Sequence, residues 1–284
     1  MSLHGEMEPG VGGAGAAAGV PGEERTRVLA SVRSVEEARI ALDAGVDIID
    51  LKDPERGALG AVEPDVIRAV VASVGGSRCV SATAGDLPME PAVVSQAVER
   101  IAVLGVDIVK VGLFDCGDVR GVLAALAHLA ARGRRIVIVC FAEMFNSGTI
   151  VGMEMLSSGT AFAGVMLDTA DKRRGSLRDH VDDAHLAAFV RQAHAAGLMC
   201  GLAGSLRLQD ITALVELVPD YLGFRGALCA AGRASALDPD RVRDVCRAVQ
   251  FASARRAATA TAGAHRAPQS RTASVPSIRL AKSM

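Results

Sequence analysis

The chain has 284 residues, of which 50% are hydrophobic and 22% charged, so it is long enough to bury one large core or two smaller ones. This composition excludes an intrinsically disordered protein. The formal net charge of −1 provides no overall positive field for nucleic acid or an anionic membrane, and an aromatic content of 3% argues against a protein that stacks single-stranded bases.

The two ends of the chain differ in composition from its middle. Residues 1–25 are rich in Gly and Ala and show no basic start followed by an apolar stretch, so we expect a flexible lead rather than a signal peptide. From residue 252 onward Ala, Ser, Thr and Arg dominate and acidic residues are absent, which predicts a disordered basic tail over 252–284. Such a tail is more typical of a solvated extension than of an arm that binds a partner.

Between these ends, residues 26–251 alternate short β-rich apolar runs with amphipathic segments, the pattern of a parallel sheet built from βα units. Helices are predicted from residue 34 to 45 and over 91–104, 118–131, 183–196, 207–217 and 239–250. Eight strands are predicted, beginning near Val28, Asp47, Cys79, Asp107, Ile136, Gly164, Met199 and Tyr221. A repeat of about 28 residues favours a single α/β domain with a TIM-type (β/α)8 barrel. A six-stranded doubly wound sheet is the alternative fold, and eight strands argue against it.

Cofactor and compartment signals are negative. The six cysteines form no Cys-x-x-Cys pair, which indicates reduced thiols and a cytoplasmic protein, and no run approaches the ~18 apolar residues of a membrane span. None of the six histidines ends a predicted strand, so a metal centre is disfavoured. The acidic segment around His180 and His185 is the one weak candidate for metal binding. No G-x-G-x-x-G opens a helix after a strand, so we expect no nicotinamide or flavin cofactor.

Lysine is scarce in this chain, and its positions are informative. The basic residues are 27 arginines and four lysines, the latter at positions 52, 110, 172 and 282. Lys52 ends the second predicted strand, Lys110 ends the fourth, and Lys172 follows the end of the sixth. Active sites of (β/α)8 barrels lie at the carboxyl ends of the strands, and alternate strands share a layer of side chains. We therefore expect one pocket to collect the charged residues of the even strands: Asp50, Lys52, Lys110, Asp168, Lys172 and Arg225.

The choice of lysine over arginine indicates a type of chemistry. An arginine stays protonated, whereas a lysine amine that is desolvated or placed near other cations loses its proton and attacks a carbonyl to form a Schiff base. Two lysines in one pocket suggest one imine former and one proton-transfer group, with Asp50 and Asp168 orienting them or moving protons. The structural alternative is a pair of buried salt bridges without catalytic role.

A phosphate site is predicted in the loops after the seventh and eighth strands, where many barrels bind phosphate through backbone amides. The candidate phosphate-binding residues there are Gly204, Ser205, Arg225 and Gly226.

Six segments of the core resemble the (5-formylfuran-3-yl)methyl phosphate synthase family of methanofuran biosynthesis, over about residues 27–250. The segments are DIIDLKDPERGALG (47–60), VSATAGD (80–86), VKVGL (109–113), LDTA (167–170) with Lys172, GLAGSL (201–206) and GFRGALC (223–229). The 140–152 loop and both ends of the chain depart from the pattern of archaeal members.

This resemblance implies a TIM-type barrel, without cofactor, that acts as a carbon–oxygen lyase on phosphates. It would condense two molecules of glyceraldehyde 3-phosphate to (5-formylfuran-3-yl)methyl phosphate, with release of phosphate and water. The resemblance assigns the Schiff base to Lys52 and the proton acceptor to Lys110, with Asp50, Asp168 and Lys172 as further active-site residues. Ser81 and Thr83, in the 80–86 segment, join the candidate substrate-binding residues.

Two alternatives remain at this point. One is a class I aldolase or transaldolase-like enzyme acting on another phosphosugar; the other is a barrel that binds a sugar phosphate without catalysis. In each case the expected partner is a small phosphorylated molecule, not nucleic acid or a membrane, and a homo-oligomer is compatible with the sequence.

Overall fold

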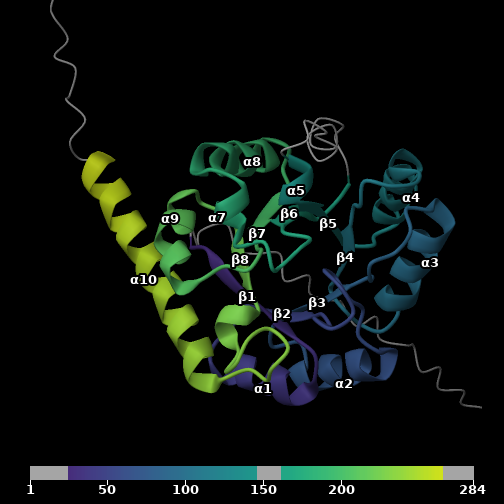
Figure 1. Ribbon diagram of the computed structural model, residues 1–284, viewed down its shortest axis with the longest axis horizontal. Coiled ribbons are helices and arrows are strands. Elements are labelled where there is room, and N and C mark those ends of the chain that lie inside the picture. The colour runs from purple at the N-terminus through teal and green to yellow at the C-terminus, as the bar shows by residue number, and fades with distance from the viewer. Residues whose placement is uncertain (1–24, 146–160, 265–284) are drawn as a thin grey trace, which may run out of the picture.

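Eight parallel strands pair in chain order, and β8 pairs with β1 to close a barrel (Figure 1). The computed structural model describes residues 25–145 and 161–264. Each predicted strand start lies within one residue of the observed one, so the predicted (β/α)8 fold is confirmed. The strands are β1 Arg27–Val32, β2 Ile48–Leu51, β3 Cys79–Thr83, β4 Ile108–Gly112, β5 Ile136–Phe141, β6 Gly164–Asp168, β7 Met199–Leu202 and β8 Tyr221–Phe224.

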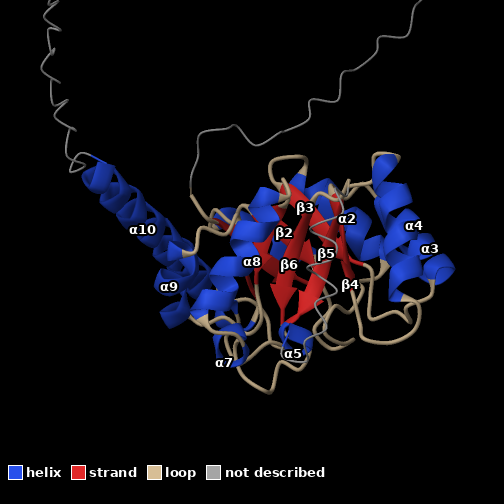
Figure 2. Cartoon of the chain, turned by 90° about the horizontal axis from the view of Figure 1, so that it is seen from above, coloured by secondary structure: helices blue, strands red, loops and turns tan. Residues whose placement is uncertain are grey.

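Helices surround the ring of strands (Figure 2). They begin where local capping chemistry predicts: the Ser34 side chain accepts a hydrogen bond from the Glu37 N–H at the start of α1, and prolines begin α2, α3 and α10. The helices are α1 Val35–Asp43, α2 Pro64–Val74, α3 Pro91–Ala102, α4 Val119–Ala131, α5 Ala142–Phe145, α7 Leu177–His180, α8 Asp183–Ala195, α9 Ile211–Glu216 and α10 Pro239–Ala264, with 3₁₀ turns η1 Leu208–Asp210 and η2 Gly226–Leu228.

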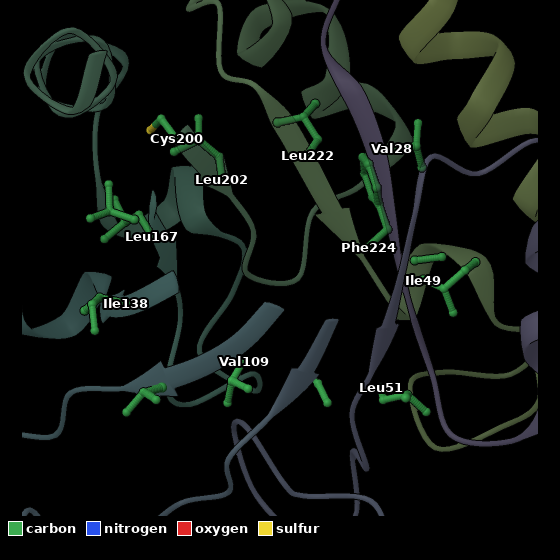
Figure 3. Packing of buried hydrophobic residues seen from close by; sticks show 14 of the residues in the cluster. Val28, Ile49, Leu51, Val109, Ile138, Leu167, Cys200, Leu202, Leu222 and Phe224 are labelled. Carbon is green, nitrogen blue, oxygen red and sulfur yellow. The ribbon is translucent and has the colours of Figure 1, made fainter. Parts of the chain in front are cut away.

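The two faces of each strand have different neighbours, because successive side chains of a strand point to opposite sides. Outward-facing residues such as Ile49, Leu167 and Leu222 belong to the large apolar cluster between the strands and the helices (Figure 3). Inward-facing apolar residues form a second, smaller cluster inside the barrel. It includes Leu29, Ile48, Ile108, Val137 and Tyr221. Asp50, Lys110 and Asp168, on β2, β4 and β6, carry the buried charges.

The predicted disordered tail is wrong for residues 252–264. These residues continue α10, which runs from Pro239 to Ala264, and the end of this helix extends away from the barrel in both views (Figures 1 and 2). Alanine is the strongest helix former, and the Ala-rich segment propagates a helix whose first turns are already fixed by packing. Residues 1–24 and 265–284, the rest of the predicted ends, lie outside the described residues.

No helix within residues 25–145 and 161–264 combines the length and apolar character needed to cross a membrane.

Candidate active site

The charged residues predicted to converge do lie together, around a cavity of about 350 Å³ at the carboxyl ends of the strands. This volume is at the lower end of the roughly 300–1,000 Å³ typical of small-molecule sites. Its lining includes Lys52, Lys110, Asp168 and Lys172, together with Gly204, Ser205, Arg225 and Gly226 from the loops after β7 and β8.

A buried ion pair forms the floor of the site. Lys110 Nζ lies 2.7 Å from Asp50 Oδ2, and the two side chains are 2% and 0% exposed. Asp50 also accepts hydrogen bonds from the hydroxyls of Ser31, at 3.0 Å, and Ser81, at 2.7 Å. Burial lowers the pKa of Lys110 below its usual value, although the Asp50 carboxylate opposes this shift. The floor therefore holds an amine that can exchange a proton with a fixed carboxylate.

A second carboxylate, Asp168 at the end of β6, lies between two lysines. Its Oδ1 accepts hydrogen bonds from Lys172 Nζ and, at 2.8 Å, from the Thr169 N–H. Its Oδ2 is buried, has no hydrogen-bond partner among the described residues, and lies 3.7 Å from Lys52 Nζ. One oxygen of Asp168 is thus engaged, while the other is available beside the amine of Lys52.

Burial and neighbouring charge set the proton affinities of this second cluster. Burial disfavours an ionised Asp168, but Lys172 and Lys52 outweigh it and hold the pKa of the carboxyl well below its usual range. Burial, with help from the Lys52 charge, lowers the pKa of Lys172 to about 8, against the opposing effect of Asp168. The cluster therefore keeps an ionised carboxylate next to a lysine that changes charge near neutral pH.

The position of Lys172 depends on a residue that the sequence did not single out for this purpose. The Glu143 carboxylate, just after β5, accepts the N–H groups of Ala170 and Asp171, each at 2.9 Å. These two residues lead directly to Lys172. The remainder of the divergent 140–152 loop beyond Phe145 lies outside the described residues.

The loop that follows Lys52 is held by the carboxylate of Asp86, which lies in the loop after β3. Asp86 accepts the N–H groups of Ala58 and Leu59, both at 2.8 Å. Gly57 has φ +120°, and an added Cβ would lie 2.0 Å from the Asp86 carboxylate, so only glycine fits there. The 47–60 and 80–86 segments therefore form one unit that shapes the loop after Lys52.

Ser81 and Thr83 support this unit rather than the cavity. Ser81 donates to Asp50, and the Thr83 hydroxyl lies 2.9 Å from the Gly60 carbonyl oxygen and 3.3 Å from that of Leu51. Neither residue is part of the cavity lining. Both hydroxyls therefore bond to groups of the protein itself, whereas the sequence predicted that they bind substrate.

The residues of the predicted phosphate loops all border the cavity, but their surroundings differ. Gly204 has φ +109° and Ser205 has φ +47°, so the chain turns sharply at the cavity, and the Ser205 hydroxyl lies 3.3 Å from the Lys172 carbonyl oxygen. Gly226 begins η2 beside the cavity. Arg225 also borders the cavity, but its guanidinium forms a buried ion pair with Glu37 at 2.5 Å. This pairing could not be seen in the sequence, because Glu37 lies 188 residues away.

Sequence reasoning missed several residues of the cavity wall. Ser31 at the end of β1 contacts Asp50, and three arginines, Arg207, Arg233 and Arg241, also line the cavity. With so many arginines in the chain, only their spatial positions distinguish these three. Among the described residues, no group of three or more His, Cys, Asp or Glu side chains could hold a metal ion.

A family model described as 4-HFC-P synthase matches residues 28–246. The chain belongs to this family. It is 35% identical over 214 residues to the (5-formylfuran-3-yl)methyl phosphate synthase of Methanocaldococcus jannaschii, an alignment that covers 72% of this chain and 91% of that protein. It is 37% identical to the enzyme of the same name from Methanopyrus kandleri, with 73% and 91% covered. A relative from Methylorubrum extorquens, whose name gives it the same activity provisionally, is 45% identical, with 80% and 92% covered.

Solved structures of lower similarity share the fold. Phosphoribosyl anthranilate isomerase from Thermus thermophilus aligns with a TM-score of 0.57 at 14% identity, covering 80% of this chain and 99% of that chain. The 3-hexulose-6-phosphate synthase from Salmonella typhimurium aligns with a TM-score of 0.57 at 15% identity, covering 80% and 100%. Both similarities concern the barrel. The family membership identifies the chain as a synthase-family enzyme.

Proposed function

We propose that this enzyme condenses two molecules of glyceraldehyde 3-phosphate to (5-formylfuran-3-yl)methyl phosphate, a step of methanofuran biosynthesis, through a Schiff base on Lys52. The name shared by the relatives from Methanocaldococcus jannaschii and Methanopyrus kandleri supports the product. The reaction balances without an oxidant or reductant, because two triose phosphates equal one furan phosphate, one phosphate and two molecules of water.

The observation that carries this proposal is the contact between Lys52 and Asp168. Lys52 Nζ lies in the cavity without a hydrogen bond to any described residue, and its ionic partner, Asp168 Oδ2, is 3.7 Å away. Lys110 and Lys172, by contrast, are each engaged closely by a carboxylate. Lys52 is therefore the amine most open to a carbonyl carbon, and Asp168 Oδ2 is placed to move the proton that imine formation requires.

The carbon skeleton of the product indicates what the other groups do. The furan carbon that bears the phosphomethyl group is a branch point, so one triose must react at its middle carbon. One glyceraldehyde 3-phosphate must therefore first move its carbonyl from C1 to C2, which requires a proton to leave one carbon and another to join its neighbour. We assign these proton transfers to Lys110, with Asp50 holding its amine in place.

The proposed reaction sequence begins with the triose bound to Lys52. The triose bound to Lys52 loses a proton next to its imine, and the electrons released expel its phosphate. The resulting enol attacks the middle carbon of the second triose phosphate and forms the new carbon–carbon bond. Ring closure, loss of two molecules of water and hydrolysis of the imine then release the furan aldehyde and return Lys52 as a free amine.

Incubation with glyceraldehyde 3-phosphate alone tests this function. We expect the ultraviolet band of a conjugated furan aldehyde, confirmed by mass and NMR spectra, with one phosphate released per product. A reversible aldol product without released phosphate would instead identify an aldolase. Lys52→Arg should abolish product formation, while Lys282→Arg, the same exchange at the lysine outside the proposed site, should leave the rate unchanged.

A further inference from the structure

Arg233, in the loop after β8, lines the cavity but takes part in none of the ion pairs among the described residues. We propose that Arg233 binds the phosphate of the triose that reacts with Lys52. This assignment rests on the proposed function for the identity of the substrate, but the binding of a phosphate group can be tested separately.

Arg225, the predicted phosphate ligand of this loop, has no donor left for a substrate. A guanidinium has five N–H groups. Its Nη1 donates to Glu37 at 2.5 Å and to the Ser31 carbonyl at 3.1 Å, and its Nη2 donates to Glu37 at 3.1 Å and to the Ser235 carbonyl at 2.8 Å. Its Nε donates to the Arg233 carbonyl at 2.9 Å. The side chain is 6% exposed, so these bonds are shielded from water.

The same bonds fix the backbone that carries Arg233. Arg225 holds the carbonyl groups of Arg233 and Ser235, and the Cys229 thiol lies 4.0 Å from the Arg233 carbonyl oxygen. The Ser235 hydroxyl accepts the Ala231 N–H at 2.9 Å. The loop is thus tied down on both sides of Arg233, and a side chain on a fixed backbone loses less freedom when it binds a ligand.

Among the described residues, the Arg233 guanidinium has no ion-pair partner. It is half-buried and lines the cavity, yet no carboxylate of the described residues lies within ion-pair distance. One hydrogen bond fixes its direction, from Nη2 to the Gly57 carbonyl oxygen at 3.3 Å. Burial lowers the pKa of Arg233, and Asp168 is the first of the groups that offset the effect. A partly desolvated cation of this kind gains most from an anion that enters the cavity.

The position of Arg233 indicates that it binds the phosphate of the triose on Lys52 rather than that of the second triose. Gly57 belongs to the loop that begins with Lys52, so the bond from Arg233 joins the β8 loop to the loop of the reacting amine. The Arg233 charge also lowers the pKa of Lys172, after the larger effects of burial and Lys52. Arg233 therefore lines the same part of the cavity as Lys52 and Lys172. A planar guanidinium can bind two phosphate oxygens together and stabilise the charge that forms as the phosphate leaves.

Arg233→Gln tests the assignment, with Arg243→Gln as the matched control, because Arg243 is an exposed arginine of α10 that pairs with Asp240 at 2.5 Å. The first measurement is the affinity for inorganic phosphate by titration calorimetry. We expect Arg233→Gln to weaken binding by about ten- to a hundredfold, the effect of losing hydrogen bonds to a charged group. The control should bind phosphate as the unaltered enzyme does.

The second measurement is the rate of borohydride trapping with glyceraldehyde 3-phosphate and with glyceraldehyde, which lacks the phosphate. Arg233→Gln should slow trapping of the phosphorylated aldehyde by about ten- to a hundredfold and leave trapping of glyceraldehyde within about twofold. An equal loss with both aldehydes, or no loss with either, would overturn the assignment.

The two measurements separate this inference from the proposed function. If Arg233→Gln loses phosphate affinity while the unaltered enzyme makes no furan, the phosphate site stands and the proposed reaction fails. If the unaltered enzyme makes the furan but Arg233→Gln binds phosphate normally, the reaction stands and Arg233 is not its phosphate ligand.

Discussion

Two carboxylate–lysine contacts differ in length, and this difference supports the roles that we propose for the two lysines. Asp50 and Lys110 form a 2.7 Å ion pair with both side chains buried, whereas Asp168 Oδ2 and Lys52 Nζ are 3.7 Å apart. A close buried pair fixes a proton donor and acceptor, while a looser pair leaves an amine free to attack. Proton transfer is therefore expected at Lys110 and covalent chemistry at Lys52.

A paired substitution separates catalysis from stability at the floor of the site. Lys110→Met leaves Asp50 without its counter-ion, which costs about 3–5 kcal/mol of folding free energy for a buried pair. Adding Asp50→Asn removes the isolated charge and should restore most of that stability. Furan formation should remain about 10²–10⁴-fold slower in the double variant, because the proton-transfer group is still missing. Recovery of activity together with stability, measured by urea unfolding and product assay, would contradict the catalytic role.

The pKa of Lys172 predicts a pH dependence. Burial lowers this pKa from 10.5 to about 8, so Lys172 is charged below pH about 8 and neutral above it. Only the charged form balances Asp168 and attracts an anionic substrate, so kcat/KM should fall as the pH rises through about 8. In Lys172→Arg the cation persists, and this alkaline decline should move upward by more than one pH unit. An unchanged decline in that variant would assign it to another group.

At the scale of elements, the turn after β7 joins the phosphate loop to the Asp168 loop. Gly204 has φ +109°, and an added Cβ would lie 2.9 Å from the Thr169 backbone nitrogen, next to Asp168. At Gly226, in the equivalent loop after β8, an added Cβ meets nothing within 4 Å. The two glycines therefore offer a matched comparison.

Gly204→Ala should lower the free energy of unfolding by about 1–3 kcal/mol, the usual cost of a residue held in a disfavoured backbone region. It should also reduce product formation, because Thr169 must move. Gly226→Ala should change stability by no more than about 0.5 kcal/mol. Denaturant unfolding followed by circular dichroism measures both, and equal effects of the two substitutions would show that the turn at Gly204 is not strained.

The elements were predictable from sequence because their signals are local. Strands coincide with short apolar runs, and Pro91 and Pro239 begin helices as predicted. The convergence of Asp50, Lys52, Lys110 and Asp168 was predictable because a closed barrel fixes which strands share a layer. The pairing of Arg225 with Glu37 and the contact of Arg233 with Gly57 were not, since they depend on loop conformations that join distant parts of the chain.

At the scale of the whole molecule, the end of α10 lies outside the packed barrel. Ala252 and Ser253 are each 4% exposed, whereas nearly all the described residues after them are exposed. Removal of residues 254–284 should therefore shift the thermal midpoint by less than about 2–4 °C, equivalent to about 1 kcal/mol for a chain of this size. Furan formation should be unaffected. Loss of activity with an intact circular dichroism spectrum would show that this end of the chain contributes to catalysis.

The central claim is that Lys52 is the lysine that forms the Schiff base with the substrate. Borohydride reduction during incubation with glyceraldehyde 3-phosphate, followed by peptide mass mapping, tests it most directly. The predicted result is a stable adduct on Lys52 and none on Lys110, Lys172 or Lys282. An adduct on another lysine, or an active enzyme that yields no adduct, would contradict the account.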